Sequence, residues 1–291
     1  MFQSSKIRVA VLRGGQSPEY DVSLKTGANV LQNLPEKYHG INILIDKDGL
    51  WHMHGLPKTP ERILRQVDVV FNALHGDIGI KENNSGIVQQ ILQTHAVPFT
   101  GSKSLSSSLS NNKLLSKEVF ARCDLQTPHY TTVSNNDNLE EKTITIFKTF
   151  LMPVIVKPAY SGFSVGVSFV NTISELKKAI DLAFRYSHIA LIEDYIKGKE
   201  ATCAVIEGFM GQPFYALMPV EIRTKAGIFF DNNSKNTSGE FEKICPGNFS
   251  SDEKKMIEDD AKKAHQALGL RHYSRSDFIV TPRRGIYILE T

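Results

Sequence analysis

Cysteine is scarce in this sequence, and its few positions exclude two classes of site. Only Cys123, Cys203 and Cys245 occur among the 291 residues, and no two of them form a C-x-x-C pair. A disulfide framework or a structural zinc site requires paired cysteines at characteristic spacings. We therefore expect neither, and we expect a reducing, cytoplasmic setting.

Long apolar runs and blocks of like charge are also missing. No apolar stretch reaches the length of about 20 residues that spans a membrane, and the first residues lead directly into a short strand-like run. The chain carries 34 lysines and arginines against 31 acidic residues, without a cluster of either sign. These features argue against secretion, membrane insertion and nucleic-acid binding, and they favour small-molecule partners.

Two common nucleotide-binding signatures are absent as well. A P-loop ends in Gly-Lys followed by Ser or Thr, and a dinucleotide-binding turn reads G-x-G-x-x-G after the first strand. The turn at Gly14 and Gly15 matches neither pattern, and the later glycine and serine loop does not either. A P-loop NTPase and a dinucleotide oxidoreductase are therefore disfavoured.

The residues that are present indicate an α/β protein with two or three packed subdomains. Short β-branched runs at 7–12, 40–45 and 67–74 alternate with helical patterns, which predicts a parallel sheet in the first part of the chain. The first of these strands ends at the Gly14 and Gly15 turn. Glycine there is expected in any strand-to-helix turn that needs a positive φ, so the turn alone is weak support for a ligand site.

A helix is predicted to follow this turn and to end at about Leu34. Ser17 has the character of its N-cap, Pro18 of its first residue, and Glu19 of an acid in its first turn.

The second part of the chain predicts small α+β units. We place a domain boundary near the serine-rich run 102–110, which gives subdomains at 1–104, 105–193 and 194–291. Expected helices are 112–122, 173–186 and 252–268, and expected strands are 154–157, 165–170, 189–193, 201–207, 213–220, 276–281 and 286–289. Residues 134–142 form a polar stretch, and residues 223–242 are expected to be a long polar loop.

A lysine beside a small-residue loop suggests phosphate binding. Lys157 ends a predicted strand, and Ser161, Gly162 and Gly166 follow it. The N–H groups of such a loop can lie against phosphate oxygens, and the lysine adds a charge that persists at neutral pH. The alternative is a surface lysine beside a hairpin turn.

Glu193 and Glu200 flank a glycine between two predicted strands. Carboxylates at a strand end and at the start of the next strand can accept hydrogen bonds from an adenine amino group and from ribose hydroxyls. A solvated, charged turn is the alternative.

Asp277 and Glu290 lie on consecutive strands joined by a short turn, so we expect them side by side. Carboxylate oxygens are the ligands that Mg²⁺ shares with nucleotide phosphates. Arg275 points to the same face by strand alternation, and it can stabilise a phosphoryl group or a developing oxyanion. Solvated strand ends are the alternative.

The run from Gly14 to Leu24 resembles the N-terminal signature of D-alanine–D-alanine ligases, which belong to the ATP-grasp superfamily. It has the glycine pair, a serine, an acid, and then Val-Ser-Leu. Further motifs follow in the family's order and approximate spacing, over nearly the whole chain: His75-Gly76, Pro98 to Ser102, Lys113, Lys157, Glu193, Glu200, Lys235, Cys245-Pro246, Arg275, Asp277 and Glu290.

This resemblance implies an ATP-grasp fold. A Rossmann-like N-terminal subdomain with a parallel sheet would precede central and C-terminal α+β subdomains that clamp ATP. The implied enzyme is a cytoplasmic, ADP-forming ligase that uses ATP and Mg²⁺ or Mn²⁺ to join two D-amino acids, D-alanine to D-alanine, for peptidoglycan synthesis. Its partners would be these small molecules; a homodimer is compatible with the resemblance, and the sequence leaves the oligomeric state open.

The resemblance also assigns roles to residues. Nucleotide binding falls to Lys113, Lys157, Ser164, Glu193, Ile196, Glu200 and Lys235. Substrate binding falls to Glu19, His75, Phe163, Asn236 and Arg275, among which Glu19 would hold the ammonium group of the first amino acid. Catalytic roles fall to Glu19, Arg275 and Lys235, and the metal ligands would be Asp277 and Glu290.

The sequence departs from the family pattern where the first substrate would be covered. Phe163 replaces a serine, Asn236 replaces a tyrosine, and the segment after His75-Gly76 is longer and different. The family also continues after the position of Glu290 into Asn and then Pro-Gly, whereas this sequence ends at Thr291. The expectation is a fragment or a site that lacks a part. A ligase with another acceptor and a catalytically weak nucleotide-binding homologue therefore remain alternatives.

Overall fold

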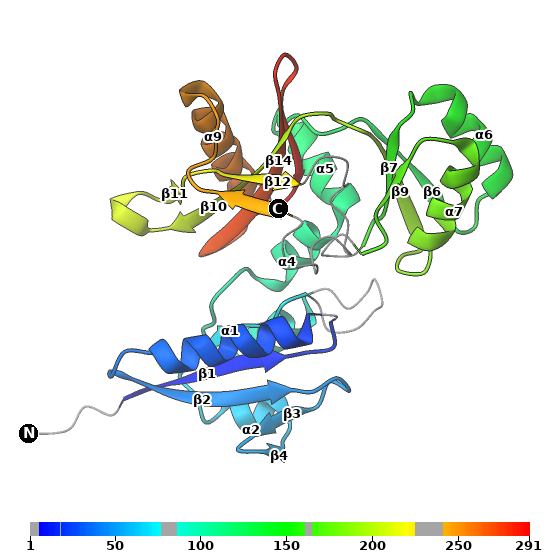
Figure 1. Ribbon diagram of the computed structural model, residues 1–291. Helices are drawn as coiled ribbons and strands as arrows, with labels where there is room; N and C mark the ends of the chain where they lie inside the picture. Colours follow the sequence, from blue (N-terminus) through cyan, green and yellow to red (C-terminus); the bar gives the residue numbers. More distant parts are fainter. Residues whose placement is uncertain (1–5, 18, 77–85, 161–164, 225–240) are drawn as a thin grey trace, which may run out of the picture. The chain divides into compact units, whose positions relative to one another are not determined.

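The computed structural model describes residues 6–17, 19–76, 86–160, 165–224 and 241–291 (Figure 1). Contacts divide the chain into two compact units, Met1–Ser108 and Leu109–Thr291. The three subdomains with boundaries at 104 and 193 stay a prediction. No helix in the described ranges is both long and apolar enough to cross a membrane.

The first unit is built on a five-stranded sheet in the order β4-β3-β2-β1-β5. Strand β1 (Ile7–Gly14) pairs in parallel with β2 (Tyr38–Ile45) and with β5 (Val69–Asn72). Two short strands, β3 (Trp51–Met53) and β4 (Leu56–Pro57), extend the sheet in antiparallel fashion. The predicted parallel sheet is confirmed at the centre, and the antiparallel edge was not predicted.

Helices cover both faces of this sheet: α1 (Tyr20–Asn33), α2 (Pro60–Leu64) and α3 (Ile87–Thr94). Successive residues of β1 face opposite sides. Val9 and Val11 pack in a cluster with apolar residues of α1, while Ala10 and Leu12 pack with buried residues of α2 and α3. Burial on both faces explains the nearly continuous apolar run of this strand.

The turn between β1 and α1 needs glycine. Gly14 and Gly15 have φ values of 93° and 97°, and a Cβ on Gly14 would lie 2.2 Å from the carbonyl oxygen of Ile45. The predicted start of the helix was wrong by two residues, because its N-cap is Glu19. The Ser17 hydroxyl instead accepts a 3.2 Å hydrogen bond from the backbone N–H of Glu19 inside the turn.

The second unit contains two sheets. The first has the order β6-β9-β7-β8, all antiparallel, and the helices α6 and α7 pack on it around a shared apolar cluster (Figure 1). The bounds are β6 Tyr130–Ser134, α6 Leu139–Thr149, β7 Val154–Pro158, β8 Ser168–Val170, α7 Ile173–Ala183 and β9 Ile189–Asp194. Helix α6, which was not predicted, begins inside the polar stretch 134–142, where Asn138 caps it by accepting from two backbone N–H groups.

The second sheet has the order β13-β12-β10-β14-β15, with β11 paired to β10. Its strands are β10 Lys199–Glu207, β11 Phe214–Ala216, β12 Val220–Thr224, β13 Phe241–Ile244, β14 Tyr273–Thr281 and β15 Gly285–Glu290. Among the described residues, the remaining helices are α4 Ser104–Asn111, α5 Lys113–Arg122, the short 3-10 helix η2 Phe209–Gly211 and α9 Ser251–Ala267. The predicted strand 213–220 is two separate strands, and the serine-rich run is largely helix α4.

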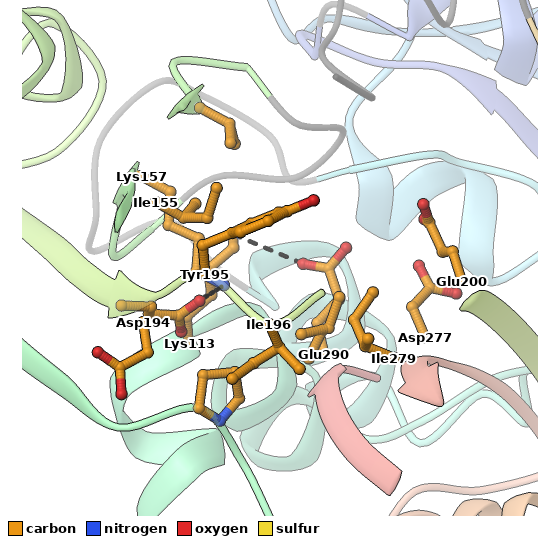
Figure 2. A pocket seen from close by; sticks show the side chains of 14 residues that line it. Lys113, Ile155, Lys157, Asp194, Tyr195, Ile196, Glu200, Asp277, Ile279 and Glu290 are labelled. Atoms are coloured by element: carbon orange, nitrogen blue, oxygen red, sulfur yellow. Dashed lines mark ion pairs between the residues drawn. The ribbon is translucent and has the colours of Figure 1, made fainter. Parts of the chain in front are cut away.

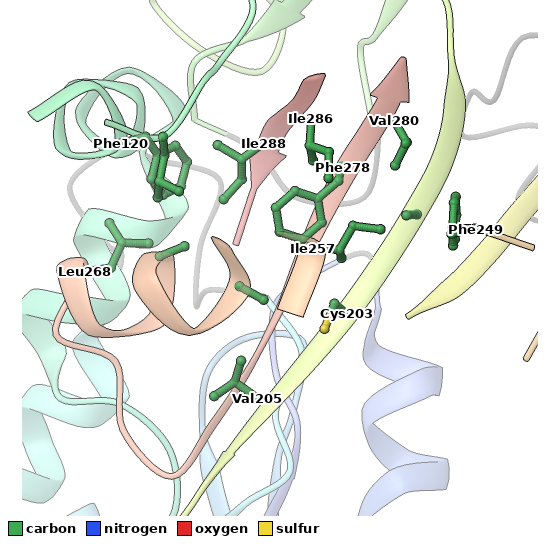
Figure 3. Close-up of a cluster of buried hydrophobic side chains, with 14 of the residues drawn as sticks. Phe120, Cys203, Val205, Phe249, Ile257, Leu268, Phe278, Val280, Ile286 and Ile288 are labelled. Atoms are coloured by element: carbon green, nitrogen blue, oxygen red, sulfur yellow. The ribbon is translucent and has the colours of Figure 1, made fainter. Parts of the chain in front are cut away.

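Helices α5 and α9 bury their apolar faces against this second sheet (Figure 3). Phe120 of α5, Ile257 of α9 and Phe278 of β14 are fully buried in one cluster. Because Phe278 directly follows Asp277, this core fixes the strand that carries a predicted metal ligand.

Candidate active site

One pocket of the second unit gathers most of the residues predicted to bind nucleotide and metal (Figure 2). It is lined by residues of both sheets and by the first residue of α5. The lining residues are Lys113, Pro128, Ile155, Lys157, Val167, Glu193, Asp194, Tyr195, Ile196, Glu200, Asp277, Ile279, Leu289 and Glu290.

Lys113 is held at the start of α5. Asn112 caps this helix by accepting from two backbone N–H groups of the first turn, and its side chain also donates a 2.9 Å hydrogen bond to the Tyr160 hydroxyl. The backbone N–H of Lys113 donates to the carbonyl oxygen of Ala159, next to the end of β7. The ammonium group of Lys113 lies 3.8 Å from a carboxylate oxygen of Glu290. The first predicted lysine therefore contacts the acidic side of the pocket.

Lys157 and Glu193 form an ion pair inside the first sheet of this unit. Both side chains are buried, and Lys157 Nζ lies 2.7 Å from Glu193 Oε2. The other oxygen of Glu193 lies 2.7 Å from Nζ of Lys117. Burial raises the pKa of Glu193, but the two lysines lower it more strongly, so its pKa falls below the ordinary value and the carboxylate stays charged. That Glu193 accepts from adenine stays a prediction; here both its oxygens contact lysines.

Asp277 and Glu290 are partners in the pairing of β14 with β15, as the sequence predicted. A register shift follows Asp277, so that Phe278 pairs with Ile288 and Leu289 is the extra residue. Leu289 lines the pocket beside the two acids. The register shift therefore lies next to the two carboxylates that line the pocket.

Two donors hold the Asp277 carboxylate. Thr202 Oγ1 donates to Oδ1 at 2.7 Å, and Arg275 donates to Oδ2 at 3.0 Å. The predicted position of Arg275 on the same face as Asp277 is confirmed.

These residues fit a divalent cation only as part of its coordination shell. Among the described residues, no group of three or more His, Cys, Asp or Glu side chains is arranged to hold a metal. Asp277 and Glu290 would therefore supply two carboxylates, and phosphate oxygens and water would supply the rest, which is the common arrangement for Mg²⁺ in nucleotide sites.

The pocket also has an apolar part that suits a purine. Ile155 and Val167 lie on one side, and Ile279 and Leu289 come from the other sheet. Tyr195 also lines the pocket, and its ring packs edge-on against Phe169 at a centroid distance of 5.0 Å. An aromatic and aliphatic lining beside lysines is typical of a site that binds a base and its phosphates.

The predicted residues Ile196 and Glu200 also line this pocket. Figure 2 shows Glu200, Asp277 and Glu290 together on the side formed by the second sheet. Glu200 lies at the start of β10, opposite Ile279 of β14. Its proposed contact with ribose stays a prediction.

The first unit brings the predicted substrate residues Glu19 and His75 close together. The Ser17 hydroxyl donates to the carbonyl oxygen of His75, and the His75 ring nitrogen Nε2 is 2.9 Å from the Thr26 hydroxyl. A Cβ placed on Gly76 would lie 4.0 Å from a carboxylate oxygen of Glu19. Partial burial lowers the pKa of His75, so its ring is neutral at pH 7. The two motifs, far apart in sequence, therefore form one cluster.

Four of the predicted residues lie outside the described part of the chain: Phe163, Ser164, Lys235 and Asn236. Their assigned roles stay predictions.

Sequence reasoning missed Lys117 and Thr202. Lysine in a helix is normally solvated, and threonine is common in strands, so neither residue type suggested a buried polar contact. The available signal was spacing: Lys117 follows Lys113 by four residues on the same face of α5.

Comparison with known proteins agrees with this geometry. The family described as "D-ala D-ala ligase N-terminus" matches residues 8–63, and "D-ala D-ala ligase C-terminus" matches residues 119–291. A D-alanine–D-alanine ligase of Geobacter sulfurreducens is 35% identical over 97% of this chain and 82% of its own length. The corresponding protein of Trichlorobacter lovleyi is 36% identical over 97% of this chain and 83% of its own.

Solved structures give the same answer for the fold. The VanG D-Ala:D-Ser ligase of Enterococcus faecalis superposes with a TM-score of 0.83 at 27% identity, covering 98% of this chain and 90% of that one. A D-alanine–D-alanine ligase of Bacillus anthracis, solved with ATP, superposes with a TM-score of 0.76 at 24% identity, covering 98% of this chain and 85% of that one. The architecture is the ATP-grasp fold, and the chain belongs to the D-alanine–D-alanine ligase family.

Proposed function

We propose that this protein joins D-alanine to D-alanine at the expense of ATP, with release of ADP and phosphate, and so supplies a precursor of peptidoglycan. The observation that carries the proposal is the pocket that combines the lysines Lys113 and Lys157 with the paired acids Asp277 and Glu290. Family membership supports the choice of reaction.

The reaction proceeds in two steps. The carboxylate of the first D-alanine attacks the γ-phosphorus of ATP, the bond to the β-phosphate oxygen breaks, and ADP leaves from an acylphosphate. The amine of the second D-alanine then attacks the acyl carbon and loses a proton, and inorganic phosphate departs as the peptide bond forms. ATP is needed because a free carboxylate has no good leaving group, whereas the acylphosphate can release inorganic phosphate.

The residues of this chain contribute position and charge rather than covalent chemistry. Lys113 and Lys157 neutralise phosphate oxygens, and Glu19 binds the ammonium group of the first amino acid. Arg275 stabilises the negative charge that develops during transfer. Asp277 and Glu290 would hold Mg²⁺, whose charge would offset the negative charge of the nucleotide phosphates.

A different acceptor is the second candidate. Phe163 removes a hydroxyl and adds an apolar ring where the family has a serine, and Asn236 replaces a tyrosine. A relative of known structure is a D-Ala:D-Ser ligase, so acceptors vary among proteins with this fold. The homodimer and the cytoplasmic location stay predictions.

The test measures phosphate release and product mass with ATP, Mg²⁺ and a panel of D-alanine, D-serine and the L-isomers. D-alanyl-D-alanine as the main product supports the proposal, and preferential formation of a mixed dipeptide identifies the second candidate.

Glu19→Gln should abolish most of the turnover while nucleotide binding persists. Phe163→Ser should increase the rate with D-alanine if the phenylalanine is what relaxes the acceptor choice. ATP binding without any turnover would support a catalytically weak homologue instead.

A further inference from the structure

Behind the nucleotide pocket lies a buried lysine for which neither the pocket nor the reaction gives a role. Lys117 is fully buried in α5 and is not among the residues that line the pocket. Its ammonium group lies 2.7 Å from Glu193 Oε1, donates to the Thr127 hydroxyl at 2.6 Å, and donates to the carbonyl oxygen of Pro128 at 3.3 Å. The Tyr130 ring lies 5.2 Å from it. These partners of the Lys117 ammonium group are all protein groups.

Glu193 connects this lysine to the pocket. One of its oxygens contacts Lys117 and the other contacts Lys157, each at 2.7 Å, and only Glu193 and Lys157 reach the pocket lining. The result is a row of three buried charges, positive, negative and positive, that begins behind the site and ends at it.

The cost of burying these charges indicates why the row has three members. A single buried ion pair gains little over apolar residues, whereas removal of one partner from a buried pair leaves an uncompensated charge and is strongly destabilising. Here Glu193 is shared by two cations, so the row keeps a net positive charge that an anion in the pocket can balance. A phosphate group is an anion of the kind that completes such a row.

The pKa of Lys117 is consistent with a positively charged row at neutral pH. Burial lowers the pKa of Lys117 to about 8, against the opposing attraction of Glu193, so the lysine is mainly charged at pH 7.

We propose that Lys117 is a positioning residue of the nucleotide site: it fixes Glu193, and Glu193 in turn aims Lys157 at the phosphates. Lys117 contacts no substrate. It holds the Glu193 carboxylate on the side away from the pocket, so that Lys157 pairs with that carboxylate in a single position. The charge of Lys117 also keeps the net charge of the three residues positive. This inference rests on the proposed function only in that the pocket binds a magnesium nucleotide, and it makes no claim about the amino acids.

The test is a double-mutant cycle on Lys117 and Glu193, with nucleotide binding as the readout. Mg²⁺ with a non-hydrolysable ATP analogue is titrated by calorimetry into the parent, Lys117→Met, Glu193→Gln and the double variant. Each single variant should bind about 10 to 100 times more weakly, the range seen when a supporting partner of a site residue is removed. The double variant should bind no more weakly than Glu193→Gln, because Lys117 acts only through that carboxylate.

A phosphate probe without a base separates this role from a contact between Glu193 and adenine. Magnesium tripolyphosphate is used as a competitor of the nucleotide analogue. If Lys117 acts through Lys157, Lys117→Met weakens tripolyphosphate and nucleotide by the same factor. A loss confined to the nucleotide would overturn the proposal, because it would place the effect at the base.

The double variant and a surface control keep the test decisive if Lys117→Met does not fold. Lys117→Met with Glu193→Gln removes one charge of each sign and avoids an unpaired buried carboxylate. Lys262→Met, which breaks the 2.7 Å ion pair with Asp259 on α9, should leave affinity unchanged. Lys117→Met with a lowered melting temperature but parental affinity, or a folded double variant that binds far more weakly than Glu193→Gln, would overturn the proposal. A parent that binds no nucleotide would instead overturn the proposed function and this inference together.

Discussion

The Thr202 hydroxyl donates a 2.7 Å hydrogen bond to Oδ1 of Asp277, across the pairing that sets these two residues opposite each other on β10 and β14. The other oxygen of this carboxylate accepts from Arg275. Asp277 is therefore oriented from two sides before any cation binds, and such supporting hydrogen bonds normally tune metal affinity.

Thr202→Val should raise the Mg²⁺ concentration needed for half-maximal nucleotide binding by about tenfold, because valine keeps the shape but removes the donor. The measurement is a Mg²⁺ titration at fixed nucleotide concentration. Thr202→Ser retains the hydroxyl and should remain close to the parent. Equal Mg²⁺ dependence in all three proteins would mean that the hydrogen bond from Thr202 does not contribute to metal binding by Asp277.

Phe278→Ala should destabilise the second unit by about 3–5 kcal/mol, the usual cost of removing a buried aromatic side chain. Phe278 is fully buried between α9 and the sheet, one residue after Asp277 (Figure 3). The free energy of unfolding of each variant is measured by urea denaturation. Phe278→Leu should lose less, and a surface change such as Leu151→Ala, at a side chain that is 89% exposed, should lose almost nothing. A loss below 1 kcal/mol for Phe278→Ala would contradict the packing described for this cluster.

Much of the site was predictable because its geometry follows from local rules. Strand alternation and one short turn were enough to place Asp277 beside Glu290. The Gly14 and Gly15 turn followed from the end of an apolar strand, and its positive φ angles are confirmed. These features need only a few neighbouring residues to be specified.

The contacts that were missed depend on distant parts of the chain. The ion pairs of Glu193 were not predicted: its two oxygens contact lysines from α5 and β7. No periodicity in the sequence reveals that three such segments converge. The N-cap of α1 was misplaced because Ser17 bonds to the distant carbonyl oxygen of His75, which local capping rules do not include.

Cys203 should resist alkylation in the folded protein, whereas Cys245 should react. Burial raises the pKa of the Cys203 thiol to about 12, and the side chain is almost completely enclosed in the core of the second unit. Cys245 is exposed. Because only the thiolate reacts, iodoacetamide at pH 8 should label Cys245 and spare Cys203, as read by peptide mass spectrometry. The unfolded protein should be labelled at both positions, and rapid labelling of native Cys203 would show that this core opens.

Nucleotide affinity should fall as the pH rises above about 8. Five groups surround the ammonium of Lys117: Glu193 on β9, Lys157 on β7, the Tyr130 ring on β6, the Thr127 hydroxyl and the Pro128 carbonyl oxygen. Burial raises the pKa of Tyr130, so the phenol stays neutral in this range, and Glu193 stays charged because the pKa of its carboxyl is lowered.

The sign of this effect follows from proton linkage. With its pKa lowered to about 8, Lys117 is charged below that pH and loses its proton as the pH rises through it. Loss of this proton removes the net positive charge of the three-residue row, and bound phosphate favours the protonated form. Affinity is therefore level below pH 8 and declines above it, by at most about tenfold per pH unit for one proton. Calorimetric titration of Mg²⁺ and the ATP analogue from pH 6.5 to 9.5 measures it. The decline should vanish in Lys117→Met, and a decline of equal size in that variant would assign the titration to another group.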